Sequence, residues 1–164
     1  MKPWIENPYQ PGDKMFLLFD SVHIFKNLYN NLLLKREFKC PPFEDKELSA
    51  NYQHVKELYQ IEFARPVKYA HKLNDKVLHP RAIEKTNVDL AHRFFHESTV
   101  HALEYFAKEL DHPEWQETAH LFSLILRFFN TVNVKNAKVA LRKRDESRRY
   151  ISETHRDLSI RIYH

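Results

Sequence analysis

The chain has 164 residues, of which 43% are hydrophobic and one is glycine, and it carries a formal net charge of +4. This length and apolar content suit a single domain, or a domain plus a fragment, and the mild positive charge permits nucleic acid as a partner without requiring it. Because tight hairpins and glycine-rich phosphate loops need residues with positive φ, the lone glycine argues against both and favours a mainly α-helical fold.

The N-terminal part of the chain predicts an irregular lead-in, then a strand, then a helix. Prolines and the single glycine in residues 1–14 indicate irregular structure. Residues 15–19, Met-Phe-Leu-Leu-Phe, form a short apolar run that is typical of a buried strand. Asp20 can cap the amphipathic helix that we expect over 21–36, and the prolines of residues 40–43 stop that helix.

The rest of the chain, as far as residue 132, predicts helices separated by prolines. Apolar periodicity indicates helices over 44–64, 81–110 and 114–132, and a short helix fits 67–73. The expected inward-facing residues are Leu48, Tyr52, Val55, Leu58 and Tyr59 in the first of these helices, Val88, Ala91, Phe95, Ala102, Phe106 and Leu110 in the long helix, and Trp115, Ala119, Phe122, Leu126 and Phe129 in the last.

Asp20 is the first candidate for chemistry, because a carboxylate at the end of a buried strand is a common ligand of Mg²⁺ in phosphoryl-transfer sites. The alternative is a plain helix N-cap, whose side-chain oxygen accepts from exposed N–H groups, and spacing alone favours this alternative. A single aspartate cannot build a two-metal site.

The eleven histidines do not form a recognisable zinc motif. His92 and His96 are four residues apart and share a helix face, but after His96-Glu97 the next histidine is His101, one position too far for H-E-x-x-H. No third ligand is evident, so structural or surface roles are expected. No nucleophile motif surrounds any serine or the single cysteine, Cys40.

Basic residues become frequent after Lys135 and are candidates for contacts with DNA phosphates, since Lys and Arg release counterions when they bind. The alternative is a solvated helix, because Asp145 and Glu146 interrupt the run. The candidate DNA-binding residues are Arg142, Lys143, Arg144, Arg148 and Arg149.

Three stretches of the chain carry a family resemblance. The first is residues 19–31, F-D-S-V-H-I-F-K-N-L-Y-N-N; the second runs through 72–80, K-L-N-D-K-V-L-H-P, and continues through 84–91 and 94–103; the third is 118–133, ending F-N-T-V-N. In this order and at this spacing they resemble the transposases of the P-element and THAP-type group. In that family a helical insertion domain, associated with GTP binding, interrupts an RNase H-like fold, and GTP aids DNA assembly rather than supplying energy.

The resemblance implies that the chain divides into three parts. Residues 1–38 would be a partial RNase H-like segment, with its strand at 15–19 and its helix at 21–36. Residues 39–136 would be the helical GTP-binding insertion domain, and residues 137–164 a basic C-terminal segment. The expected fold is therefore mainly α: a helical insertion-type domain preceded by a short strand and helix remnant of an RNase H-like core.

The resemblance also implies site residues. Asp20 would be the second carboxylate of a three-acid metal site whose other acids have no recognisable context here. Lys72 and Lys76 would meet the phosphates of GTP, and Asn130 and Asn133 would lie near its base. Where the family usually has an aspartate, this chain has Asn130. An amide offers one acceptor and one donor, so guanine selectivity is expected to weaken by about 1–3 kcal/mol.

The function expected from the sequence is that of a fragment or domesticated derivative of a P-element-like DNA transposase. Its candidate ligands are GTP, Mg²⁺ and DNA, and its catalytic site is incomplete. An unpaired sheet edge would invite self-association or a chain that completes the RNase H fold. The lone cysteine and the lack of a membrane-length apolar run favour an intracellular protein that is not secreted and does not contact a membrane. The family resemblance implies that it is nuclear. The alternative is a helical protein-interaction module without nucleotide or DNA activity.

Overall fold

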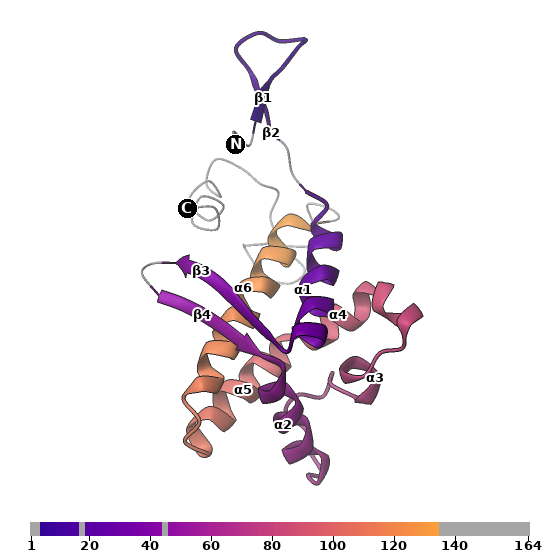
Figure 1. Cartoon of the computed structure of the whole chain (residues 1–164), viewed down its shortest axis with the longest axis vertical. Helices are drawn as coiled ribbons and strands as arrows, with labels where there is room; N and C mark the ends of the chain where they lie inside the picture. The colour runs from indigo at the N-terminus through magenta and orange to yellow at the C-terminus, as the bar shows by residue number, and fades with distance from the viewer. Residues whose placement is uncertain (1–3, 17–18, 44–45, 135–164) are drawn as a thin grey trace.

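The structure is a computed structural model and describes residues 4–16, 19–43 and 46–134. Helices dominate it, and the two small sheets are antiparallel pairs, so the mainly α-helical fold is confirmed (Figure 1). The elements in chain order are β1 Trp4–Glu6, β2 Lys14–Phe16, α1 Ser21–Lys35, β3 Glu37–Phe43, β4 Lys46–Asn51, α2 Tyr52–Phe63, α3 Asp75–Leu78, the 3₁₀ helix η1 Ala82–Thr86, α4 Val88–Phe94, α5 Glu97–Glu109 and α6 Glu114–Val132.

A hairpin of β1 and β2 stands apart from the helices at the N-terminal end (Figure 1). Gly12 lies in its turn at φ 95°, a conformation that suits glycine. The predictions for this region were wrong, because the lead-in contains strand β1 and the described ends of the apolar run 15–19 are not buried. Met15 is 40% exposed and Phe19 is 87% exposed. An isolated two-stranded ribbon keeps its faces solvated, so apolar residues in it need not be buried.

Helix α1 confirms the predicted helix to within one residue at its end. Asp20 caps it, with Oδ1 accepting from the backbone N–H groups of Val22 and His23 at 2.9 and 3.3 Å. The chain leaves the helix through Arg36, which adopts the left-handed conformation at φ 68°. One face of α1 is buried, and its residues are Phe25, Tyr29, Leu32 and Leu33.

The expected helix over 44–64 is wrong in its first part, because β4 occupies residues 46–51 and pairs with β3. Leu48 and Ala50 are buried two residues apart, which is the period of a strand. Asn51 then starts α2 by accepting from the N–H of Gln53 at 2.8 Å. The helical part of the prediction therefore begins only at Tyr52.

The short helix expected over 67–73 is also wrong. After α2 the chain turns, and the buried Glu62 accepts from the N–H groups of Tyr69 and Ala70 at 2.7 and 3.0 Å. These amides therefore bond to a side chain instead of to helical carbonyls. The next helix is the single turn α3, which Asn74 caps.

The long helix expected over 81–110 is broken into η1, α4 and α5. Side-chain acceptors restart the helix twice: Asn87 accepts from the N–H of Asp89, and His96 accepts from the N–H of Ser98. Leu110, expected to be buried, is 41% exposed because α5 ends at Glu109. The remaining stripe is placed as predicted, with Ala91, Phe95, Ala102 and Phe106 buried and Val88 packed against the core.

Helix α6 matches its prediction, and its buried face joins an aromatic core. Phe25 of α1 stacks on Phe129 of α6 with ring centroids 4.1 Å apart. Phe122 packs against Phe94 and Phe95 at 5.2 and 4.8 Å. Aromatic contacts at these distances contribute beyond the area that they bury, so this cluster holds α1, α4 and α6 together.

Two buried tyrosines attach α3 to the rest of the fold. The hydroxyl of Tyr29 on α1 donates to the carbonyl of Val77 at 2.6 Å, and the hydroxyl of Tyr52 on α2 donates to the carbonyl of Leu78 at 2.9 Å. Burial, with smaller effects of Tyr52 and Glu84, raises the pKa of Tyr29. Both hydroxyls remain neutral donors at physiological pH, and they fix the C-terminal end of α3.

We predict that Phe25→Ala lowers the free energy of unfolding by about 3–5 kcal/mol, because it leaves a cavity where α1 meets α6. Phe19→Ala is the control, since Phe19 is 87% exposed, and its effect should stay within about 0.5 kcal/mol. Urea denaturation followed by circular dichroism measures both. Equal shifts of the two midpoints would contradict the packing described here.

Candidate nucleotide-binding site

Asp20 serves as the N-cap of α1 in this structure. Within the ranges that the structure describes, no group of three or more His, Cys, Asp or Glu side chains is placed to hold a metal ion. A single carboxylate does not satisfy the six oxygen ligands that Mg²⁺ demands. The metal-binding role of Asp20 therefore stays a prediction from the family resemblance.

Lys76 is engaged with a carboxylate. Its Nζ lies 3.1 Å from Oε1 of Glu84, and the guanidinium of Arg81 lies 2.7 Å from the same oxygen. Hydrogen bonds from Arg81, with a smaller one from Lys76, lower the pKa of Glu84 to about 2. Glu84 is therefore ionised at neutral pH, and it offsets much of the charge that Lys76 would offer a phosphate.

Lys72 lies at one end of a row of rings that leads to α6. The ring of His71 is 5.8 Å from that of His96, His96 is 5.8 Å from His92, and His92 is 6.3 Å from Phe129. The positive charge of Lys72 is close enough to contribute to the lowered pKa of His96. The row of rings thus runs from His71, the residue before Lys72, past the α4–α5 junction to Phe129 on α6. We call His71, His92 and His96 the histidine row.

Asn130 and Asn133 lie half-buried at the C-terminal end of α6, and Asn133 is its C-cap residue. The backbone N–H of Asn133 donates to the carbonyl of Phe129 at 2.9 Å. Neither asparagine side chain hydrogen-bonds to another residue in the described part of the chain. Both residues lie toward the Phe129 end of the histidine row.

Asn30 lies in the first family motif, residues 19–31, but was not predicted to be a site residue. Its side-chain nitrogen donates to the carbonyl of Lys85 at 3.0 Å, while its Oδ1 is buried without a partner among the described residues. A buried acceptor without a donor is costly, and a ligand N–H would satisfy it. No sequence pattern distinguishes Asn30, because Lys26 and Asn27, one turn earlier on the same helix, are polar as well.

His96 joins the histidine row to the helix-capping network. Its Nδ1 accepts from the N–H of Ser98 at 3.1 Å, so that nitrogen must be unprotonated for the cap to form. Burial, followed by the effect of His92, lowers the pKa of His96. The sequence did not predict that the rings of His92 and His96 lie between His71 and Phe129.

The candidate DNA-binding residues Arg142, Lys143, Arg144, Arg148 and Arg149 lie outside the described residues. The part of the chain that is described contains no helix long and apolar enough to cross a membrane.

Comparison with known proteins places the chain in a family. The model of the family described as "TNP-like, GTP-binding insertion domain" matches residues 22–146, which is more than half of the chain. The chain therefore belongs to the TNP-like, GTP-binding insertion domain family. A search of curated proteins found no match.

A solved structure points to a more particular relative. The Drosophila P element transposase, in a strand transfer complex, is similar to this chain with 22% sequence identity and a TM-score of 0.67. The match covers 82% of this chain and 29% of the transposase chain. At this identity the likeness shows the fold. Together with the family match, it confirms the resemblance to P-element-like transposases that the sequence motifs indicated.

We predict that His96→Asn reduces the loss of stability on acidification. The folded-state pKa of His96 lies below its usual value of 6.5, so the unfolded chain binds the proton more tightly. Its contribution to stability is present above the unfolded pKa and is lost as the pH falls below it. Asparagine is a good N-cap that does not titrate in this range. Thermal melts between about pH 7.5 and 5 measure the effect.

The control for this prediction is His101→Asn, which removes an exposed histidine from the same helix. It should keep the pH dependence of the parent protein. If both variants lose stability on acidification as steeply as the parent, the cap at His96 does not respond to pH.

Proposed function

We propose that this chain is a fragment or domesticated derivative of a P-element-like DNA transposase and that it binds GTP. The observation that carries the proposal is the family match over residues 22–146, on a fold similar to part of the P element transposase. The chain spans 29% of that transposase chain, so the activity of a whole transposase is not assigned to it.

The residues proposed for GTP fall into two groups. Lys72 is the phosphate-side cation, because it is exposed and takes part in no ion pair with a described residue, whereas Lys76 is paired with Glu84. Asn130 and Asn133 form the base side, because their amides are unengaged by described residues at the end of α6. The histidine row lies between the two groups and gives a ligand a partly aromatic floor.

Asn130 determines how selective this site is for guanine. The family's usual aspartate would accept from both N1–H and N2–H of guanine in one charge-assisted pair. An amide at Asn130 supplies one acceptor and directs a donor toward the other N–H. We therefore expect GTP binding with reduced discrimination against ATP.

We propose that the catalytic site of this chain is incomplete. Asp20 would be an inherited metal-binding carboxylate of an RNase H-like core, of which residues 1–38 would be a remnant and 39–136 the insertion domain. One carboxylate cannot clamp the two Mg²⁺ ions that strand transfer requires. The missing acids would come from a second chain. The basic C-terminal segment, residues 137–164, would contact the phosphate backbone of DNA. Such a protein would work in the nucleus.

A protein-interaction module is the second candidate function, and a specific feature favours it. Apolar side chains are exposed at the end of α2, in the turn after it and on α5: Phe63 is 70%, Val67 75% and Tyr69 50% exposed. Tyr69 stacks on Tyr105, itself 44% exposed, at 4.9 Å. Exposed apolar groups of this kind mark binding surfaces in many soluble proteins.

We predict saturable binding of GTP in calorimetric titrations of the full chain with GTP and Mg²⁺. Lys72→Ala should weaken it roughly tenfold, by removing one charge-assisted contact. Asn130→Asp should raise the preference for GTP over ATP roughly five- to hundredfold, because it restores the paired acceptor.

Lys108→Ala is the matched control for the titrations, since Lys108 is an exposed lysine on α5 remote in sequence from the proposed site. It should bind GTP as the parent does. If a folded sample gives no heat with either nucleotide, and Asn130→Asp does not restore it, the GTP proposal is wrong and the interaction module is favoured.

We predict that the chain alone does not cleave or join DNA. In a Mg²⁺-dependent assay on supercoiled plasmid, the parent protein and Asp20→Asn should both give only the background rate. Asparagine at residue 20 can still cap α1, so this substitution should not destabilise the fold. Turnover by the parent that is abolished in Asp20→Asn would refute the incomplete-site proposal.

A further inference from the structure

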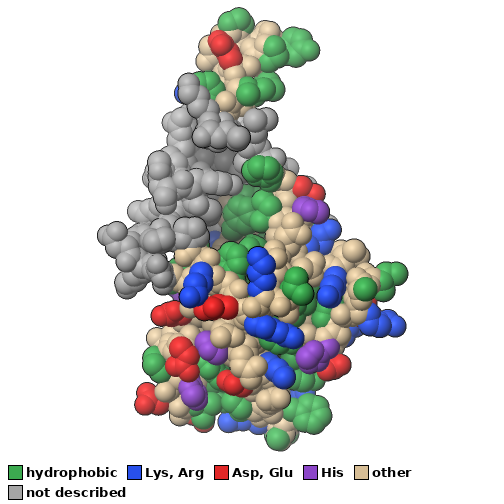
Figure 2. Space-filling view, in the orientation of Figure 1, with side chains coloured by type: hydrophobic (Ala, Val, Ile, Leu, Met, Phe, Trp, Pro, Cys, Tyr) green, Lys and Arg blue, Asp and Glu red, His purple; other side chains and the backbone are tan. Residues whose placement is uncertain are grey.

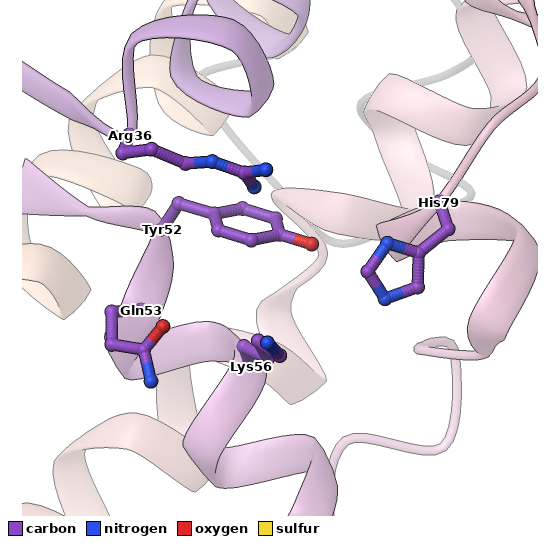
Figure 3. Close-up of a pocket in the computed structure, with 5 residues that line it drawn as sticks. All are labelled: Arg36, Tyr52, Gln53, Lys56 and His79. Atoms are coloured by element: carbon purple, nitrogen blue, oxygen red, sulfur yellow. The ribbon is translucent and has the colours of Figure 1, made fainter.

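A cavity of about 250 Å³ lies where α1 ends and α2 begins, and it belongs to none of the residues proposed for GTP. Five side chains line it: Arg36, Tyr52, Gln53, Lys56 and His79. Figure 3 shows the guanidinium of Arg36 over one face of the Tyr52 ring, Lys56 toward the other side and His79 beyond the hydroxyl. Three separate elements thus bring side chains to one small space.

The lining is strongly basic. Arg36 and Lys56 are cations, and the imidazole of His79 offers a ring N–H as a hydrogen-bond donor. None of the three forms an ion pair with a carboxylate of the described residues. Of the nearby acids, Glu57 accepts from the Gln53 amide at 3.0 Å, and Asp75 is close enough to influence Tyr52. Lys and Arg side chains also gather over the middle of the face in Figure 2. The charge of the cavity is therefore available to an anion.

Arg36 is held in place before any ligand arrives. Its guanidinium carbon lies 4.5 Å from the centroid of the Tyr52 ring. Its carbonyl accepts from the N–H of Tyr52 at 2.8 Å, and the hydroxyl of that tyrosine is in turn fixed on the carbonyl of Leu78. A guanidinium whose position is already set loses less freedom on binding, which favours recognition of a planar or tetrahedral oxyanion.

The position on α2 adds to the positive potential. Tyr52, Gln53 and Lys56 belong to the first turns of this 12-residue helix, whose N-terminal end carries a partial positive charge. The cavity is smaller than the roughly 300–1,000 Å³ typical of pockets that enclose a whole drug-sized ligand. It therefore suits one charged group rather than an entire nucleotide.

We propose that this cavity is a phosphate-binding site, in which Arg36, Lys56 and the imidazole of His79 donate to the oxygens of one phosphate group. The phosphate can belong to a free nucleotide or to the backbone of DNA, and the chemistry is shared. This proposal does not rest on the GTP site, because the two share no residue.

The test is a titration of the full chain with inorganic phosphate and with pyrophosphate at constant ionic strength, followed by ¹⁵N–¹H NMR. We expect saturable shifts at Gln53, Lys56 and His79. Lys56→Gln should weaken the affinity about tenfold, the loss of one charge-assisted hydrogen bond, and Arg36→Gln at least as much. Lys108→Gln, on α5, should leave it unchanged.

Two further arms identify the source of the phosphate. Competition by a short DNA duplex, abolished in Lys56→Gln, assigns the site to the DNA backbone, whereas competition by GTP that persists in Lys72→Ala assigns it to a free nucleotide. The proposal is overturned if the shifts stay linear to high phosphate concentration, or if they are the same in Lys56→Gln. Thermal melts show that each variant is folded, so a negative result counts against the site.

Discussion

The stacking of Phe25 on Phe129 is the contact on which the rest of the structure depends. It joins α1 to α6 across about a hundred residues. Bringing together residues so far apart in the sequence costs chain entropy, which the burial of apolar side chains must offset. Phe94, Phe95 and Phe122 extend the same cluster. Because His92 packs beside Phe129, the cluster that holds the helices together also sets the histidine row and the end of α6.

Polar groups then fix the segment between α2 and α4, which apolar packing alone would leave loose. Glu62 bonds the turn at Tyr69 and Ala70, and two tyrosine hydroxyls hold the carbonyls at the end of α3. This segment carries Lys72 and Lys76 toward the proposed nucleotide site and His79 toward the basic cavity. Side chains buried for stability thus position charged groups on two surfaces.

The sequence predicted α6 and most of α1 because a long 3.6-residue period and clear caps dominate there. It failed for β4, where Leu48 and Ala50 fit a strand period inside a helix-like stretch. It also joined α4 and α5, because the stripe through Ala91 and Phe95 continues across the break that His96 creates. For the site, motifs supplied Lys72, Asn130 and Asn133, but the cavity of Arg36, Lys56 and His79 could not be predicted. Those residues come from three elements that only the tertiary fold brings together.

Arg36 gives the left-handed end of α1 a meaning beyond helix termination. Glycine is the residue that usually occupies such a position, and another residue there costs about 1 kcal/mol in backbone energy. This chain places an arginine at that point and keeps its one glycine in the β1–β2 turn. A search for thermostable variants would therefore favour glycine or asparagine at residue 36. Either substitution would raise the melting temperature but would also remove the positive charge of Arg36 from the surface. Stability and charge are opposed at this single position.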